Sequence, residues 1–182
     1  MAARQQHGIN FEQAVKSLLK VEDTKSYTAK WDIGEDTSVK FIKAGSSIDM
    51  GSVTRIFEAL ETPGWRMILG RHTNGMCEYV QDFIFTSEIC SKLKGKLTLE
   101  DVSEFDKKIK SYAVGYHEPA RAFAKQWKAQ HKSVTGMLTI SPKIDSKNQR
   151  RVQCGINNGN FCKLFPEAKH NNTYDSLVGE LF

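Results

Sequence analysis

The order of helix-like and strand-like segments over residues 9–72 is the feature that most constrains the fold. Apolar side chains recur at helical spacing over 9–20 and again over 52–60. Runs rich in β-branched and aromatic residues fill the intervals between and after them, at 26–33, 37–43, 47–50 and 64–72. This order predicts a helix, three strands, a helix and a strand, and therefore a mixed α/β fold.

The second half of the chain predicts further elements of both kinds. We expect a strand at 78–85, two or three helices within 86–132, and a late pair of strands at 136–140 and 150–156, joined by a loop at 141–149. The chain has four prolines, and no internal repeat or Pro/Ser-rich linker divides it. A single domain of 182 residues is therefore expected.

Composition narrows the class of protein. Hydrophobic residues make up 40% of the chain and charged residues 26%, as in globular proteins. No apolar run approaches the roughly 20 residues that a membrane span requires, and the N-terminus lacks the apolar region of a signal peptide. We therefore expect a cytoplasmic, intracellular location without a membrane partner.

The cysteines predict free thiols in a reducing compartment rather than a zinc site. Cys77, Cys90, Cys154 and Cys162 form no CxxC pair, and no His/Cys group has zinc-finger spacing. The histidines are scattered, and no serine has the surroundings of a nucleophile elbow, so a Ser/His hydrolase has little support.

Charge is distributed unevenly along the chain. The net charge is −2 over residues 1–104, +8 over 105–151 and −1 over 152–182. An acidic first part followed by a basic segment suits a protein that holds metal ions and also binds a polyanion. A lysine-rich solvated helix surface is the alternative explanation of the basic segment.

Residues 30–43, which read KWDIGEDTSVKFIK, carry the groups needed for metal-dependent hydrolysis. Side chains alternate along a strand, so Ser38 and Lys40 share one face while Val39 points into the core. The backbone carbonyl of Val39 can then ligate a metal at a sheet edge, and Asp32 reaches the same place across the turn. A lysine beside the attacking water can lower the pKa of the water or stabilise the phosphorane. The alternative is an ordinary solvated hairpin.

The segments GINFEQAVKSLL, KWDI and SVKFIK, with the helix and strand that follow, resemble the PD-(D/E)xK restriction-endonuclease-like superfamily over residues 8–72. The resemblance implies a core of helix, three strands, helix and strand. It implies a Mg²⁺ site, with Mn²⁺ as an alternative, formed by Asp32, Glu12 and the Val39 carbonyl. It also implies catalytic roles for Asp32, Ser38, Lys40 and Glu12.

The sequence departs from the family pattern at two positions. Trp31 stands where proline is usual, and Ser38 stands where an acidic residue is usual. The missing carboxylate must come from Glu12, or from Glu35, Asp36 or Asp49.

A second informative stretch, SPKIDSKNQRRVQC, carries residue types that bind nucleic acid. Arg pairs with guanine, Asn and Gln pair with adenine, and Lys contacts phosphate. The candidate DNA-binding residues are Lys143, Lys147, Asn148, Gln149, Arg150, Arg151 and Gln153. A flexible solvated hairpin loop is the alternative.

These observations predict a Mg²⁺-dependent DNA endonuclease, most simply a type II restriction enzyme acting on double-stranded DNA as a homodimer. Residues 8–72 are then the catalytic core, and 86–182 a helical and β-hairpin elaboration for DNA binding and dimerisation. A repair nuclease, a junction resolvase and a non-catalytic DNA-binding protein of the same fold remain alternatives. An RNA-directed role fits the charge but lacks aromatic-rich strand motifs.

Overall fold

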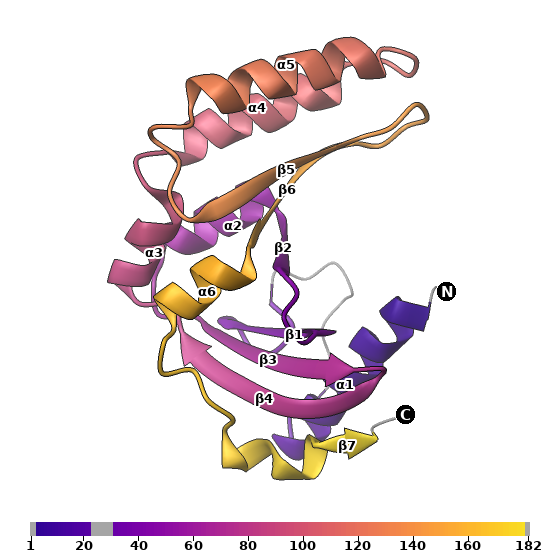
Figure 1. Ribbon diagram of the computed structural model, residues 1–182, viewed down its shortest axis with the longest axis vertical. Helices are drawn as coiled ribbons and strands as arrows, with labels where there is room; N and C mark the ends of the chain where they lie inside the picture. Colours follow the sequence, from indigo (N-terminus) through magenta and orange to yellow (C-terminus); the bar gives the residue numbers. More distant parts are fainter. Residues whose placement is uncertain (1–2, 23–30, 181–182) are drawn as a thin grey trace. The chain divides into compact units, whose positions relative to one another are not determined.

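The computed structural model describes residues 3–22 and 31–180. The chain divides into two compact units. Unit 1 comprises residues 1–46, 64–86 and 161–182, and unit 2 comprises residues 47–63 and 87–160. Each unit contains its own sheet and its own helices (Figure 1).

Unit 1 is built on a four-stranded sheet with the order β1-β3-β4-β7. Its strands are β1 (Thr37–Lys43), β3 (Arg66–Thr73), β4 (Met76–Ile84) and β7 (Gly179–Glu180). β1 pairs parallel to β3, and the other two pairs are antiparallel. The helices in this part of the chain are α1 (Ala3–Leu18), α6 (Asn158–Leu164), which begins at the end of unit 2, and the 3₁₀ helix η1 (Asn172–Leu177).

Helix α1 covers one face of this sheet. Phe11 and Val15 are fully buried against Val39 of β1 and Ile68 of β3, because they lie four residues apart on one side of the helix. The Phe11 ring also stacks on Phe41, with 4.7 Å between ring centroids. The α1-facing side of β1 therefore carries Val39 and Phe41, and Ser38 and Lys40 belong to the opposite side.

Aromatic residues bury much of that opposite side. Phe83 of β4 packs against Phe161 and Phe165, with ring centroids 5.4 and 4.3 Å away. Phe85 stacks on Trp65 at 3.6 Å. Residues that follow unit 2 in the sequence thus complete the core of unit 1.

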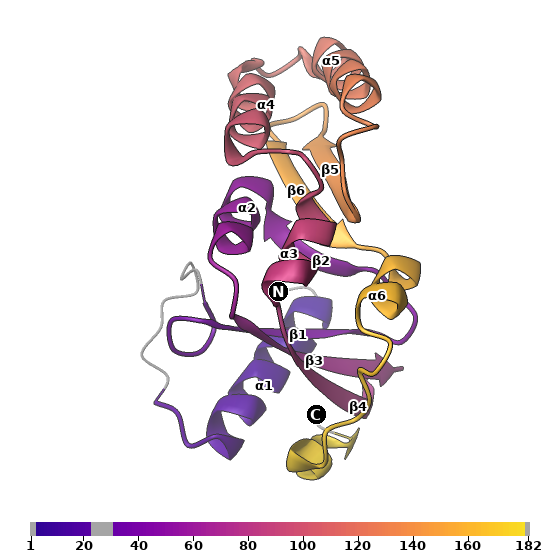
Figure 2. The ribbon, with the colours of Figure 1, turned by 90° about the vertical axis from the view of Figure 1, so that its left-hand side faces the viewer.

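Unit 2 is built on a three-stranded antiparallel sheet with the order β2-β6-β5. The strands are β2 (Ile48–Ser52), β5 (Leu138–Ile144) and β6 (Arg150–Ile156), and the helices are α2 (Val53–Glu61), α3 (Ser87–Lys94), α4 (Leu99–Ser111) and α5 (His117–Gln130). Helices α4 and α5 run side by side (Figures 1 and 2), with the Phe105 and Trp127 rings stacked at 4.1 Å. The buried face of the sheet carries Ile140, Val152 and Ile156.

The predicted mixed α/β class is confirmed at the level of element types, and the strands at 37–43 and 150–156 have the expected bounds. The strand expected at 47–50 forms as β2, but it pairs with β6 in unit 2 instead of joining β1. Most of the strand expected at 26–33 lies outside the described residues, and Ile33 forms only an isolated bridge with Thr37. Helix α6, η1 and β7 were not predicted.

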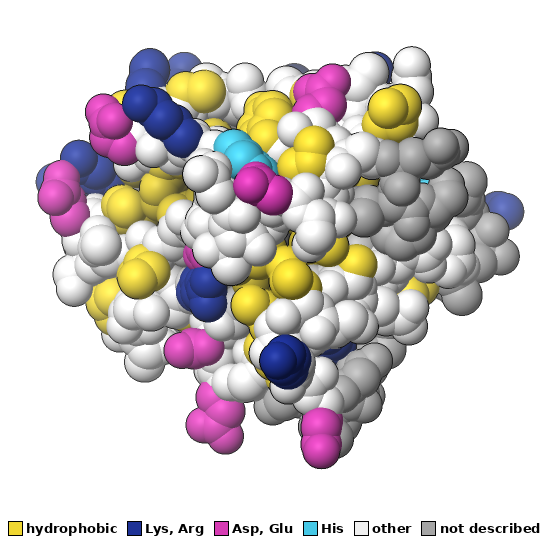
Figure 3. Space-filling model, turned by 90° about the horizontal axis from the view of Figure 1, so that it is seen from below, with side chains coloured by type: hydrophobic (Ala, Val, Ile, Leu, Met, Phe, Trp, Pro, Cys, Tyr) yellow, Lys and Arg dark blue, Asp and Glu magenta, His cyan; other side chains and the backbone are white. Residues whose placement is uncertain are grey.

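The surface of the molecule seen from below in Figure 3 carries acidic, basic and hydrophobic side chains together, so one sign of charge does not dominate this view. Within residues 3–22 and 31–180, no helix is both long enough and apolar enough to span a membrane.

Candidate nuclease site and nucleic-acid interface

The first candidate site is centred on Asp32, which folds back onto the start of β1. The chain reverses at 34–36, and backbone hydrogen bonds between Ile33 and Thr37 close the turn in both directions, at 3.1 and 3.2 Å. Oδ2 of Asp32 then accepts hydrogen bonds from the backbone amide of Val39 at 2.6 Å and from the Ser38 hydroxyl at 3.1 Å. The carboxylate is thus fixed by two donors of β1.

This contact also orients the Val39 carbonyl. The N–H and C=O of one residue in a strand point to the same side, so the Val39 carbonyl faces away from β3, as its amide does. Within the described part of the chain, β1 is an edge strand of its sheet. No described residue donates a hydrogen bond to Oδ1 of Asp32. A carboxylate oxygen and a backbone carbonyl are therefore directed to the same edge of the sheet.

Lys40 lies one position further along the same face as Ser38. Its side chain is half-buried, and it forms no ion pair with any described residue. A lysine without an ion-pair partner is available to contact a bound anion. The hydrogen bonds of Asp32 thus bring it to Ser38 and Val39, and Lys40 lies two residues after Ser38 on the same face of β1. The part of Lys40 in the site stays a prediction.

Glu12 is engaged differently. Its Oε1 accepts a hydrogen bond from the ammonium group of Lys16 at 2.6 Å, and the Lys16 side chain is only 6% exposed. Helix α1 lies on the side of the sheet that carries Val39, opposite Lys40. The observed contact of Glu12 is therefore with Lys16, and its place in a metal site stays a prediction.

Other acidic residues add little at this edge. Asp36 accepts a hydrogen bond from the Thr37 hydroxyl at 2.9 Å, and Glu35 is exposed in the turn. Asp49 belongs to unit 2. Among the described residues, no three His, Cys, Asp or Glu side chains are grouped as metal ligands. Carboxylate and carbonyl oxygens such as those of Asp32 and Val39 are of the type that Mg²⁺ and Mn²⁺ prefer as ligands.

The second candidate site is the outward face of the unit 2 sheet. Strand alternation directs Thr139, Ser141 and Lys143 of β5 away from the helices, together with Arg151 and Gln153 of β6. Lys143 lies directly opposite Arg151 in the ladder. Like charges at opposed positions destabilise a hairpin. An anionic partner bound between Lys143 and Arg151 would remove this repulsion.

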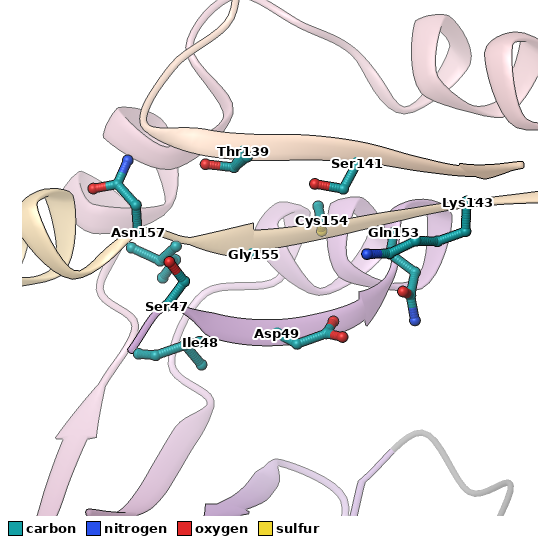
Figure 4. Close-up of a pocket in the computed structure, with 11 residues that line it drawn as sticks. Ser47, Ile48, Asp49, Thr139, Ser141, Lys143, Gln153, Cys154, Gly155 and Asn157 are labelled. Carbon is teal, nitrogen blue, oxygen red and sulfur yellow. The ribbon is translucent and has the colours of Figure 1, made fainter. Parts of the chain in front are cut away.

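A hollow of about 270 Å³ lies on this face (Figure 4). Figure 4 shows the polar side chains that line it, which come from the three strands and from the residues just before β2 and just after β6: Ser47, Asp49, Thr139, Ser141, Lys143, Gln153 and Asn157. Hydroxyls, amides, one cation and one carboxylate are the groups that form hydrogen bonds with base edges and phosphates. Thr139 and Ser141 were missed by the sequence analysis, although the alternation in LTISPKI predicts their direction once the strand is extended to Ile144.

The predicted DNA-binding residues divide into two groups. Lys143, Lys147, Asn148 and Arg151 are exposed, and Gln149 and Gln153 are partly exposed. Arg150 differs, because its side chain is only 6% exposed and its guanidinium group donates to backbone carbonyls. In this structure, therefore, Arg150 supports the loops and does not present its guanidinium group to a base.

The turn between β5 and β6 is ordered by Asp145. Its Oδ1 accepts hydrogen bonds from the amides of Lys147 at 3.0 Å and Gln149 at 2.9 Å. The hydrogen bond from Gln149 is the largest cause that holds the pKa of this carboxyl below its usual range. Asp145 thus shapes the turn while Lys147 and Asn148 remain exposed.

Comparisons of the chain with protein-family models, with curated proteins and with solved structures found no match.

Proposed function

We propose that this protein is a metal-dependent endonuclease that hydrolyses phosphodiester bonds of double-stranded DNA. The observation that carries the proposal is the hydrogen bond from the Val39 amide to the Asp32 carboxylate, with Lys40 next along the same strand on the face that also carries Ser38. One short segment thus contains a carboxylate, a carbonyl directed to the sheet edge, and a lysine that has no ion-pair partner among the described residues.

Each group has a distinct part in the proposed reaction. Asp32 and the Val39 carbonyl hold Mg²⁺ or Mn²⁺, which when bound supplies Lewis acidity at the phosphoryl oxygen and an activated water. Lys40 stabilises the negative charge that develops on the phosphorane and orients the attacking water. Ser38 keeps Asp32 in place. Glu12 is proposed as a further carboxylate for the metal.

The outward face of the unit 2 sheet is proposed to bind the DNA. Lys143 and Arg151 meet phosphates, and the polar groups of the hollow meet base edges. A type II restriction enzyme is the form of the activity that we favour. Because such an enzyme cuts both strands of a symmetric site, it requires two copies of Asp32 and Lys40, and hence a homodimer.

The experiment compares Lys40→Ala and Asp32→Ala with a matched variant, Lys43→Ala. Lys43 is an exposed lysine at the end of the same strand. With plasmid and phage DNA and Mg²⁺, we expect the wild type and Lys43→Ala to cut. Lys40→Ala and Asp32→Ala should lose at least about 100-fold in rate and still shift duplex DNA in a gel.

The pattern of products distinguishes the candidate functions. Discrete bands support a restriction enzyme, and cutting confined to branched DNA supports a junction resolvase. One observation favours a DNA-binding protein without catalysis. Position 38 is a serine, whereas the family that the sequence resembles has an acidic residue there, so one negative charge for the metal is missing. If the wild type shifts DNA but leaves linear, supercoiled and branched substrates intact, the endonuclease proposal is wrong.

A further inference from the structure

Arg150 joins two loops of unit 2 that are distant in sequence. Its Nη1 donates to the carbonyl oxygens of Asp145 at 2.6 Å and Gln149 at 2.8 Å, across the β5–β6 turn. Its Nη2 donates to the carbonyl oxygen of Ala113 at 3.3 Å, in the connection between α4 and α5. Figure 1 shows this connection and the tip of the hairpin at the same end of the unit. One buried guanidinium group therefore holds the two loops together.

The α4–α5 connection presents apolar side chains to solvent. Val114 is 67% exposed and Tyr116 is 60% exposed. Leaving two large side chains uncovered in a short loop forgoes the free energy that their burial gives. Gly115 between them has φ +91°, a conformation that glycine adopts without strain and that fixes the direction of the loop.

Cationic side chains lie on the loops and the hairpin around these two side chains, and the carboxylate of Glu118, which follows Tyr116 by two residues, is paired with Arg121 at 2.7 Å. Lys147 is exposed on the joined turn, and Lys143 and Arg151 follow on the outward face of the hairpin. Lys108 lies over the Tyr112 ring, 5.3 Å from its centroid. In a symmetric contact with a second copy, these cations would meet each other. Duplex DNA is anionic at its phosphates and apolar at its stacked bases. It therefore complements both the positive charge and the exposed apolar side chains.

We propose that loop 112–116 and turn 145–149 form one composite tip that enters a DNA groove. Lys147 contacts phosphates there, and Val114 and Tyr116 pack against sugars and a base step. Proteins that bind the minor groove commonly insert apolar side chains at such a step and unstack it in part. Arg150 is the positioning residue, because it sets the distance between the apolar loop and the basic turn. This inference rests on the proposed DNA binding, not on catalysis.

The test measures binding in the Lys40→Ala background, so that cleavage does not enter. Val114→Ala/Tyr116→Ala should bind a fluorescent duplex at least about 10-fold more weakly, with an unchanged salt dependence, because apolar contacts release no counterions. Lys147→Ala should weaken binding and lower the salt slope by about one. Met76→Ala/Ile84→Ala is the matched control, since these residues of unit 1 are 53% and 55% exposed. It should bind as the parent does.

A duplex with 2-aminopurine supplies a second measurement. We expect its fluorescence to rise at one position when the parent binds, and not when the Val114→Ala/Tyr116→Ala variant binds. Equal affinity of the parent and that variant overturns the inference. A second result also overturns the inference: the Val114→Ala/Tyr116→Ala variant sediments as a monomer where the parent is a dimer, and its DNA affinity per subunit is unchanged. In that case the loop contacts a second copy of the chain.

The outcomes separate this inference from the proposed function. A wild type that never cuts but binds through Tyr116 supports the tip and contradicts the nuclease. A wild type that cuts with binding independent of Tyr116 contradicts the tip alone. Arg150→Met, with folding checked by circular dichroism, should weaken duplex binding although it removes no exposed contact. Unchanged binding of folded Arg150→Met contradicts the positioning role.

Discussion

Oδ2 of Asp32 lies 2.6 Å from the backbone nitrogen of Val39 and accepts its hydrogen bond. This relationship directs the carboxylate to the edge of β1 without the help of a second side chain. Ser38 adds a weaker restraint, because its hydroxyl reaches the same oxygen at 3.1 Å. The two donors suggest different sensitivities to mutation.

Ser38→Ala should reduce cleavage only modestly. The Val39 amide continues to hold Asp32, and the loss is one hydrogen bond to a charged group. Because this hydrogen bond is long, at 3.1 Å, we expect the low end of the range for such bonds, about 1.5 kcal/mol or about 12-fold in rate. Steady-state cleavage of a single-site duplex measures it. Complete loss of activity would show that the hydroxyl acts on the metal or the water directly.

Glu12→Gln tests whether α1 supplies the carboxylate that position 38 lacks. If Glu12 ligates the metal, the Mg²⁺ concentration for half-maximal cleavage should rise by about 10-fold or more, since a ligand charge is lost. Lys16→Met is the control, because it breaks the 2.6 Å Glu12–Lys16 pair and retains the carboxylate. Equal Mg²⁺ dependence in Glu12→Gln and wild type would assign Glu12 to the ion pair alone.

Gly70→Ala should destabilise unit 1. A Cβ at this position would lie 2.5 Å from the ring of Phe11, a core residue, and 2.6 Å from the ring of Phe41, which packs against the core. Overpacking of this kind costs about 1–3 kcal/mol, and a lowering of Tm by about 2–12 °C is expected. Gly8→Ala in α1, where nothing lies within 4 Å, should leave Tm unchanged or raise it.

The sequence predicted local structure well where alternation was strong. Thr37–Lys43 and Arg150–Ile156 are strands with the bounds expected. The pairing of β2 could not be predicted from the sequence. Its partner β6 lies about 100 residues further on, and the residues of neither strand specify which strand it pairs with. The 3₁₀ helix η1 and the short β7 carry too little periodicity to be recognised.

The sequence predicted those parts of the candidate site that depend on contacts between residues close together in the chain. Asp32 and Ser38 belong to one short segment, so the turn between them brings the Asp32 carboxylate onto β1, and Lys40 follows on the same strand. Arg150 was assigned to DNA by residue type. Its direction follows from Val152 and Ile156, which are buried two and six positions further along β6 and place residue 150 on the same inward face. The fourth-position spacing of Glu12 and Lys16 likewise predicts their ion pair.

The buried thiols predict a loss of stability at alkaline pH. Burial raises the pKa of Cys154 to about 12 and that of Cys77 to about 11, from the ordinary thiol value of 9.0. In the unfolded chain these thiols ionise near pH 9, whereas in the folded chain they stay protonated. Their contribution is therefore complete below pH 9 and is lost as the pH rises toward 12, by about 2 kcal/mol for Cys154 between pH 8 and 10.5.

Denaturant unfolding at pH 8 and pH 10.5 measures this loss. Cys154→Ala should flatten the pH dependence of the unfolding free energy, whereas Cys162→Ala should not, because Cys162 is exposed. In the native protein at pH 8, a thiol reagent should modify Cys162 quickly and the three buried cysteines slowly. If Cys154→Ala and Cys162→Ala have the same pH dependence of the unfolding free energy, the loss of stability at alkaline pH does not come from ionisation of Cys154.

Asp49 predicts a sequence preference. It is the acidic side chain in the hollow of unit 2, with Lys143 and Gln153, and its Oδ1 also accepts a hydrogen bond from the Gly51 amide at 2.9 Å. A carboxylate on a DNA-binding face repels phosphate but accepts a hydrogen bond from the amino group of cytosine. Asp49→Asn should therefore relax discrimination at one base pair by about 1–3 kcal/mol and should not weaken binding to unrelated DNA.

Selection from a randomised duplex library compares Asp49→Asn with Glu61→Gln. Glu61 is an exposed acid at the end of α2 in the same unit, so the charge change is equal while the position is remote from the hollow. A changed preference at one position in Asp49→Asn alone supports base contact. Equal increases in affinity for all sequences in both variants would mean that Asp49 acts only through its charge, because the contact with a base would then contribute no discrimination.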